Sequence, residues 1–148
     1  MALLFPPFQL SDPEATARAA RALGDRLSIG DVVLLEGDVG AGKTHFARAL
    51  LQSQLSTTED VPSPTFTLVQ TYDTPKSEIW HADLYRIGSV QEIEELCLSE
   101  AFETAICLIE WPDRLGELKP FSALTVTLTT GEQEDTRLIY AQSADPNW

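Results

Sequence analysis

Residues 34–51 read LLEGDVGAGKTHFARALL and place three glycines and a lysine between two apolar stretches. Glycine inside a helix or strand costs stability, so three glycines this close together need a local reason. The residues before them, 30–37, include a short apolar run that predicts a strand. The residues after them, 43–55, carry apolar side chains near helical spacing. The sequence therefore predicts a strand, a glycine-rich turn and a helix, in that order.

The turn, GDVGAGKT at residues 37–44, matches the phosphate-binding loop pattern G-x-x-x-x-G-K-[S/T]. In such a loop the backbone N–H groups surround a polyphosphate, and the following helix presents its positive N-terminal end to the anion. Side chains would block the close approach of the backbone to the phosphates, and the loop has glycines for this purpose at Gly37, Gly40 and Gly42. Lys43 would supply a positive charge for the β- and γ-phosphates, and the Thr44 hydroxyl would coordinate Mg²⁺. The pattern predicts nucleotide binding.

The composition favours a single globular domain, because 43% of the 148 residues are apolar and no stretch approaches the ~20 consecutive apolar residues that span a bilayer. Residues 1–12 lack the basic start of a signal peptide, and the two cysteines, Cys97 and Cys107, have neither disulfide nor metal-site spacing. We therefore expect a cytoplasmic protein. The net charge of −13 argues against direct binding of nucleic acid, so we expect a partner to bind any RNA that is involved.

Alternating helix and strand patterns predict one α/β domain over residues 1–148. We expect a three-layer P-loop fold whose mostly parallel central sheet is extended by antiparallel strands. Capping boxes at Ser11 and Ser89 predict two helix starts, the first helix running to Leu27 and the second being short and acidic. Strand patterns cover residues 65–72 and 77–85 as a hairpin, 105–111 as a single strand, and 123–130 with 136–142 as a pair. Residues 143–148 are expected to fray, with Trp148 either docked or idle.

A phosphate-loop enzyme also needs a carboxylate on a neighbouring strand to hold the metal or its water. Glu110 ends AICLIE, a continuous apolar run typical of a strand buried on both faces of a parallel sheet. Asp83 ends EIWHAD, whose alternation favours an outer strand. Both remain candidates on the residues alone. The loop VPSPTFTLV, residues 61–69, carries hydroxyls that fit either a γ-phosphate switch or an ordinary strand entry.

ATP is the expected nucleotide. Guanine-specific GTPases of the Ras type read the base with an N-K-x-D loop, and the only asparagine of this chain is Asn147.

Four segments, GDVGAGKT, SPTFTLV, HADLYRI and LIEWPDRL, resemble in their order and spacing the bacterial TsaE family, also called YjeE. The resemblance covers about Ser11 to Arg137. It implies a cytoplasmic ATPase that binds ATP or ADP with Mg²⁺, hydrolyses ATP, and is required for threonylcarbamoyladenosine in tRNA. It also implies action on the TsaD–TsaB heterodimer, in which TsaD transfers the threonylcarbamoyl group and the ATPase resets or remodels the complex between turnovers.

The resemblance also assigns residues. The phosphates would be held by Gly40, Ala41, Gly42, Lys43, Thr44 and His45, and the metal by Thr44 and Glu110. The catalytic group would comprise Lys43, Asp83, Glu110 and Thr65, with Ser63, Thr65 and Trp111 coupling a switch. The nucleotide would also lie near Asp12, Pro13, Asp113 and Arg137. Two positions depart from the family: His45 stands where a second threonine is common, and Cys97 replaces a frequent glycine.

Two other functions remain open on the sequence. A small-molecule P-loop kinase would need paired arginines over its substrate, whereas Arg86, Arg114 and Arg137 are isolated in the sequence. The other is a non-hydrolysing nucleotide-gated adaptor, and measured ATP hydrolysis that is slow and that no partner accelerates would favour it.

Overall fold

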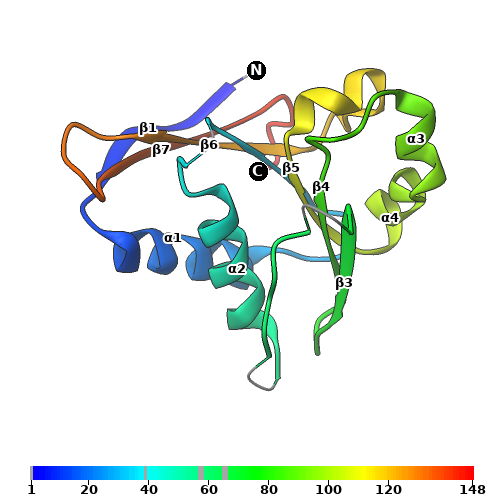
Figure 1. The fold of residues 1–148 in the computed structure, drawn as a ribbon, viewed down its shortest axis with the longest axis horizontal. Coiled ribbons are helices and arrows are strands. Elements are labelled where there is room, and N and C mark those ends of the chain that lie inside the picture. Colours follow the sequence, from blue (N-terminus) through cyan, green and yellow to red (C-terminus); the bar gives the residue numbers. More distant parts are fainter. Residues whose placement is uncertain (1, 39, 57–58, 65–66) are drawn as a thin grey trace.

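The computed structural model of the chain describes residues 2–38, 40–56, 59–64 and 67–148. Its helices and strands follow one another along the chain as β1 (Ala2–Leu10), α1 (Pro13–Arg26), β2 (Val32–Glu36), α2 (Lys43–Gln54), β3 (Val69–Asp73), β4 (Glu78–Asp83), α3 (Val90–Glu95), α4 (Leu98–Thr104), β5 (Ile106–Glu110), the 3₁₀ helix η1 (Pro112–Leu118), β6 (Leu124–Thr130) and β7 (Arg137–Ser143). Figure 1 shows the two longest helices, α1 and α2, together below the sheet.

One seven-stranded sheet, in the order β1-β7-β6-β2-β5-β4-β3, organises the fold. The four inner strands β6, β2, β5 and β4 run parallel to one another. The outer pairs β6/β7, β7/β1 and β4/β3 are antiparallel. The expected α/β fold, with a parallel centre extended by antiparallel strands, is confirmed.

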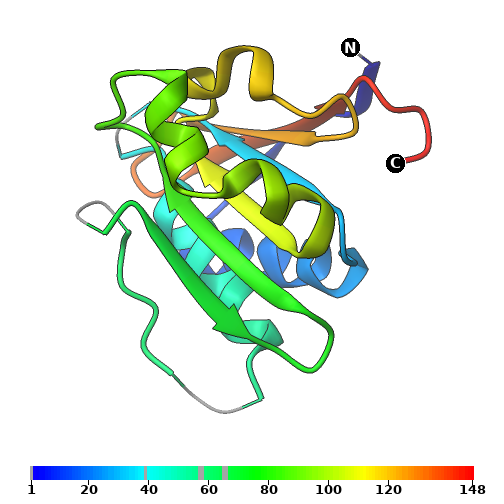
Figure 2. The ribbon, with the colours of Figure 1, turned by 90° about the vertical axis from the view of Figure 1, so that its right-hand side faces the viewer.

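Helices cover both faces of the sheet, as Figures 1 and 2 show: α1 and α2 lie on one face, and α3 and α4 on the other. Alternate residues of β2 serve the two layers. Val33 and Leu35 belong to the core cluster that includes Phe46 and Leu50 of α2. Val32 and Leu34 instead belong to the cluster that includes α3, α4 and η1 side chains. A central strand that is apolar on both faces is what a three-layer parallel sheet requires.

The helix starts agree with the sequence except by one residue in α1. Asp12, not Ser11, is the N-cap, and its Oδ1 accepts a hydrogen bond from the Ala15 N–H at 2.8 Å. The prediction of a Ser11 cap was wrong because Pro13 occupies the first helical position, which places the cap immediately before it. Ser89 caps α3 as expected, accepting from the Glu92 N–H at 3.3 Å.

Three elements were not expected from the sequence: β1, α4 and η1. Strand β1 contains Pro6 and Pro7, which cannot donate to a neighbouring strand, and it is tolerated because it lies at the edge of the sheet. Its pairing with β7 is irregular, with register shifts between Leu3 and Phe5 and between Phe5 and Phe8.

Of the helices that the structure describes, none combines the length and apolar character needed to cross a membrane.

The C-terminal end is attached to the body of the protein. Ser143 lies in β7, is buried, and donates a hydrogen bond from Oγ to the Ala123 carbonyl at 2.9 Å. Trp148 packs against the core, lines a pocket together with Leu23 of α1 and Leu124 of β6, and donates its indole N–H to the Ser122 carbonyl. Of the two positions left open for Trp148, the structure has the docked one. The fraying of residues 143–148 stays a prediction.

Cys97 joins α3 to α4 in a left-handed conformation, with φ 63° and ψ 24°. A residue with a Cβ is strained there by about 1–2 kcal/mol. Its side chain is exposed and makes no capping hydrogen bond. We predict that Cys97→Gly raises the free energy of unfolding by about 0.5–1 kcal/mol, since the relief of strain exceeds the entropy that glycine adds to the unfolded chain. Urea unfolding measures it, with Cys97→Ala as the control, because alanine removes the same exposed thiol but keeps the Cβ. An unchanged or lower free energy for Cys97→Gly contradicts the prediction.

Candidate nucleotide-binding site

The glycine-rich loop follows β2 and leads directly into α2. Gly42 is the N-cap of α2, with φ 102°, and Gly40 has φ 83°. Both values lie in the region that glycine adopts without strain. Gly37 serves a different purpose, because a Cβ at that position would lie 2.3 Å from the Leu128 carbonyl oxygen of β6. The three glycines therefore let the loop pass close to β6 and turn into the helix.

Lys43 is buried at the start of α2, with 6% of its surface exposed. Its ammonium donates to the Gly37 carbonyl and lies 3.6 Å from the centroid of the Trp111 ring. Burial lowers the pKa of Lys43, and the nearby charges of Glu110, Asp83, Asp38 and Asp113 oppose this. An anion in the loop would therefore give the buried ammonium a counter-charge at short range.

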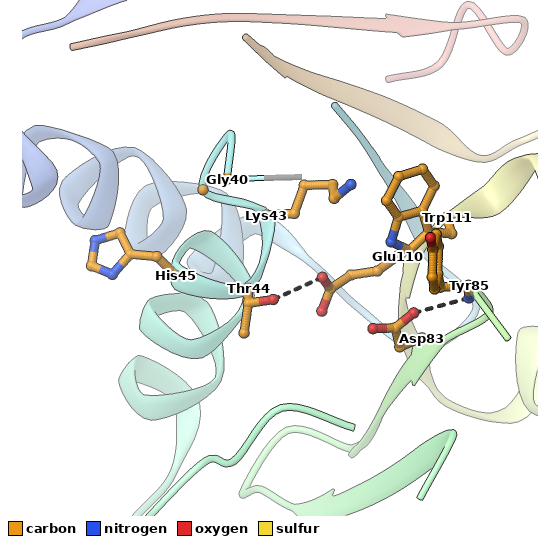
Figure 3. A pocket seen from close by; sticks show the side chains of 9 residues that line it. Gly40, Lys43, Thr44, His45, Asp83, Tyr85, Glu110 and Trp111 are labelled. Atoms are coloured by element: carbon orange, nitrogen blue, oxygen red, sulfur yellow. Dashed lines mark hydrogen bonds between the residues drawn. The ribbon is translucent and has the colours of Figure 1, made fainter. Parts of the chain in front are cut away.

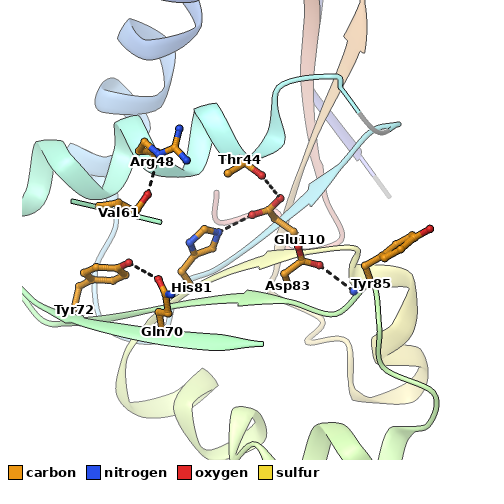
Figure 4. Close-up of polar contacts among 9 residues, drawn as sticks. All are labelled: Thr44, Arg48, Val61, Gln70, Tyr72, His81, Asp83, Tyr85 and Glu110. Carbon is orange, nitrogen blue, oxygen red and sulfur yellow. Dashed lines mark hydrogen bonds and ion pairs between the residues drawn. The ribbon is translucent and has the colours of Figure 1, made fainter. Parts of the chain in front are cut away.

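Thr44, Glu110 and His81 form a chain of polar contacts, in which Thr44 is half-buried and the other two are buried (Figure 4). The Thr44 hydroxyl donates to Oε1 of Glu110 at 2.9 Å, and Oε2 of Glu110 lies 2.7 Å from Nε2 of His81. The side chains of His81 and Glu110 are 0% and 2% exposed. Nδ1 of His81 has no hydrogen-bond partner among the described residues. A buried polar atom without a partner costs stability, so packing alone does not explain a histidine at this position. The contact of its other ring nitrogen with Glu110 does explain it.

Asp83 lies beside Glu110, because the parallel register of β4 and β5 pairs these two residues. Asp83 is 6% exposed, and its Oδ1 accepts a hydrogen bond from the Tyr85 N–H at 3.0 Å. The two candidate carboxylates therefore end adjacent parallel strands at the same edge of the sheet. The strand of Asp83 was expected to be an outer strand, and it lies second from the edge of the sheet, because β3 pairs on its other side.

A pocket of about 390 Å³ opens between the loop and these strand ends (Figure 3). This volume is typical of small-ligand sites, which span ~300–1,000 Å³. Its lining consists of Gly40, Gly42, Lys43, Thr44, His45, Asp83, Tyr85, Glu110 and Trp111. The loop side offers a lysine and a helix N-terminus to an anion, and the strand side offers two carboxylates to a cation.

A magnesium ion fits this arrangement if it binds together with the phosphates of a nucleotide. Within the described ranges no group of three or more His, Cys, Asp or Glu residues could hold a metal alone. Mg²⁺ typically binds through one or two carboxylates together with substrate phosphates, and hydroxyl and carboxylate oxygens are its preferred ligands. Thr44 and Glu110 already meet at 2.9 Å and provide these two kinds of oxygen.

Comparison with known proteins identifies the chain. The sequence model described as "Threonylcarbamoyl adenosine biosynthesis protein TsaE" matches residues 10–139. The chain belongs to the TsaE family. The family inferred from four motifs is thus confirmed, over nearly the span that those motifs suggested.

Individual TsaE relatives agree with this assignment. A protein of Rickettsia bellii named tRNA threonylcarbamoyladenosine biosynthesis protein TsaE is 41% identical over 119 residues, which cover 80% of this chain and 83% of that protein. The Bacillus subtilis protein of the same name is 33% identical over 130 residues, covering 87% and 80%. The crystal structure of Bacillus subtilis YdiB matches the fold with a TM-score of 0.80 and 26% identity, covering 100% of this chain and 91% of that one.

The two departures from the TsaE pattern have clear structural settings. His45 is exposed, and its Nε2 lies 3.0 Å from the Pro13 carbonyl, which connects the starts of α1 and α2. Figure 3 shows His45 on the opposite side of the α2 start from Glu110. Cys97 is not among the pocket-lining residues, and it adopts the left-handed conformation between α3 and α4 although it is not glycine.

The remaining described residues assigned by the TsaE resemblance are not among those that line the pocket. Asp12 caps α1, and Pro13 contacts His45 through its carbonyl. Asp113 is exposed in the first turn of η1, near enough for its charge to act on Lys43. Arg137 contacts the loop carbonyls of Gly40 and Ala41. Ser63 is half-buried outside the pocket lining, and the role predicted for Thr65 falls outside the described residues.

Two residues of the site were not singled out from the sequence. His81 contacts Glu110, and Tyr85 lines the pocket with its ring 4.9 Å from that of Trp111, centroid to centroid. Both belong to the HADLYRI segment, where His81 stands two residues before Asp83. Side chains two residues apart on a strand share a face, and that was the available signal for His81.

Proposed function

We propose that this member of the TsaE family binds ATP with Mg²⁺ in the pocket between the glycine-rich loop and the ends of β4 and β5, and hydrolyses it. The observation that carries the proposal is the contact of Thr44 with Glu110 beside buried Lys43. It brings the hydroxyl and carboxylate that Mg²⁺ uses to the N-terminus of α2, where phosphates bind.

Each residue has a defined task in this proposal. Lys43 and the backbone N–H groups at the start of α2 bind and orient the phosphates. Thr44 and Glu110 hold Mg²⁺, which would neutralise developing negative charge on the phosphate oxygens. His81 keeps Glu110 oriented through their 2.7 Å contact. Asp83 accepts a hydrogen bond from an attacking water and so orients it.

The proposed biological role is threonylcarbamoyladenosine biosynthesis on tRNA, the process for which the relatives are named. We propose that the chain acts there on the TsaD–TsaB pair and meets tRNA only through that complex. The net charge of −13 supports this, because an acidic surface repels the tRNA phosphates. The cytoplasmic location stays a prediction.

A small-molecule kinase is less well supported by the pocket. Among the described residues, the pocket lining contains no arginine, so the paired arginines of a phosphate-acceptor lid are missing from it. The lining contains Trp111 and Tyr85 instead, whose rings form a tilted pair.

The direct test of the proposal is titration of a fluorescent ATP analogue in Mg²⁺ and in EDTA. Binding that is strengthened by Mg²⁺ is the expected result. A chain that binds no adenine nucleotide in either buffer rejects the proposed function.

Asp83→Asn separates the two carboxylates. Asparagine keeps an oxygen that can accept from the Tyr85 N–H but loses the negative charge. We expect ATP hydrolysis to fall by about a hundredfold or more, the lower end of the range for positioned acid–base groups, while Mg²⁺ still strengthens nucleotide binding. Phosphate release and analogue titration measure the two effects. A variant that hydrolyses ATP at the normal rate and supports tRNA modification assigns Asp83 a structural role only.

A further inference from the structure

Arg137 is the first residue of β7 and connects the β6–β7 hairpin to the glycine-rich loop. Its Nε donates to the Ala41 carbonyl at 3.0 Å, and one terminal nitrogen donates to the Gly40 carbonyl at 3.2 Å. The other terminal nitrogen donates to the Thr136 carbonyl at 2.8 Å, which steadies the guanidinium within its own hairpin. One side chain therefore holds two consecutive carbonyls of the loop.

These contacts orient two peptide planes. In a trans peptide the C=O and the following N–H point in opposite directions. The Gly40 carbonyl faces Arg137, so the Ala41 N–H points away from it and closes a turn onto the Asp38 carbonyl at 3.0 Å. The Ala41 carbonyl also faces Arg137, so the N–H of Gly42 points away from β7, on the residue that lines the pocket.

The loop needs such an external constraint because of its glycines. Gly40 and Gly42 have φ values of 83° and 102°, and a glycine chain samples many other conformations when nothing holds it. Donors that are already oriented bind an anion more tightly, because the entropy of ordering them is not lost on binding.

We propose that Arg137 is a positioning residue, which orients the backbone donors of the loop before any phosphate binds rather than contacting the nucleoside. The consequence for nucleotide affinity rests on the proposed function, whereas the order of the ligand-free loop does not. The experiment therefore has one arm for each.

The first arm is hydrogen exchange of the nucleotide-free protein, followed by NMR at single amides. Arg137→Lys keeps the positive charge but replaces the planar fork with one ammonium group, which cannot reproduce both bonds. The matched control is Arg48→Lys, because Arg48 also holds a backbone carbonyl, that of Val61 at 2.8 Å, away from the pocket lining. We expect exchange of amides 40–44 to quicken by about tenfold in Arg137→Lys and not in Arg48→Lys. Unchanged exchange in Arg137→Lys overturns the proposal.

The second arm is competition against a fluorescent nucleotide by ADP and by inorganic tripolyphosphate. Arg137→Lys should weaken both competitors by the same factor, about ten- to a hundredfold, because the loop binds phosphates in each. Weakened ADP with unchanged tripolyphosphate would mean that Arg137 acts on the nucleoside, and the positioning role is then wrong. A wild-type protein that binds neither ligand rejects the proposed function, and hydrogen exchange still decides the role of Arg137. Arg137→Gln, which keeps an amide donor without the charge, should change exchange in the same direction and serves if the lysine variant unfolds.

Discussion

Lys43→Ala is expected to reduce the affinity for ATP by about ten- to a hundredfold. A hydrogen bond to a charged group is worth roughly 1.5–3 kcal/mol. Among the described residues that line the pocket, Lys43 is the only lysine or arginine. In the structure its ammonium lies between the Gly37 carbonyl and the Trp111 ring, at 3.6 Å from the ring centroid. A bound phosphate would replace these neutral partners with a charged one.

Lys76→Ala is the matched control for that variant. Lys76 also donates its ammonium to a glycine carbonyl, that of Gly24 at 2.8 Å, but it lies in the β3–β4 turn. Titration of the fluorescent ATP analogue should separate the two variants, with Lys76→Ala binding as the wild type does. Equal affinity in Lys43→Ala and wild type removes Lys43 from the site.

Glu110→Gln is expected to spare nucleotide binding in EDTA and to slow phosphate release by about a hundredfold. Glutamine keeps the shape and can still accept from the Thr44 hydroxyl, which stands 2.9 Å from Oε1. It loses the negative charge that holds Mg²⁺ beside the phosphates. The strengthening of nucleotide binding by Mg²⁺ should therefore also disappear.

Glu100→Gln controls for the amide substitution, because Glu100 is an exposed glutamate on α4, outside the pocket lining. Comparison of Glu110→Gln with Asp83→Asn then distinguishes the metal-holding carboxylate from the one that orients water. A Glu110→Gln protein that releases phosphate at the wild-type rate would contradict the role assigned to Glu110.

The strand, loop and helix around residues 34–51 were predictable because their chemistry is local. A loop that surrounds an anion with backbone donors needs glycine at fixed spacings and a helix directly after it. The proximity of Asp83 and Glu110 was also foreseeable in outline, since parallel strands bring their carboxyl ends to one edge. Their direct pairing in register required the sheet order.

Other features depend on contacts that no local pattern encodes. Arg137 and the loop are more than 90 residues apart, separated by 96 positions for Ala41, so only the folded sheet shows which carbonyls the side chain holds. His81 sits in a strand pattern where an isolated histidine usually packs in the core, and its contact with Glu110 comes from a neighbouring strand. Strand β1 was not predicted because it contains Pro6 and Pro7, and proline argues against a strand except at a sheet edge.

We predict that the chain alone hydrolyses ATP slowly. Among the described residues that line the pocket, none is an arginine that could neutralise transition-state charge. A finger supplied by a partner is worth roughly 10³–10⁵ in rate in other P-loop enzymes. The TsaD–TsaB pair is the proposed source of acceleration, through such a group or through ordering of the site next to Trp111.

Steady-state phosphate release at saturating ATP and Mg²⁺ tests this central claim most directly. The wild-type chain is measured alone and with increasing TsaD–TsaB, and Glu110→Gln is measured in parallel to exclude contaminating activity. We predict slow release by the chain alone, a rate that rises with TsaD–TsaB to a plateau, and no rise with Glu110→Gln. A fast basal rate that stays flat across the titration, or no release at any TsaD–TsaB concentration, would contradict the account.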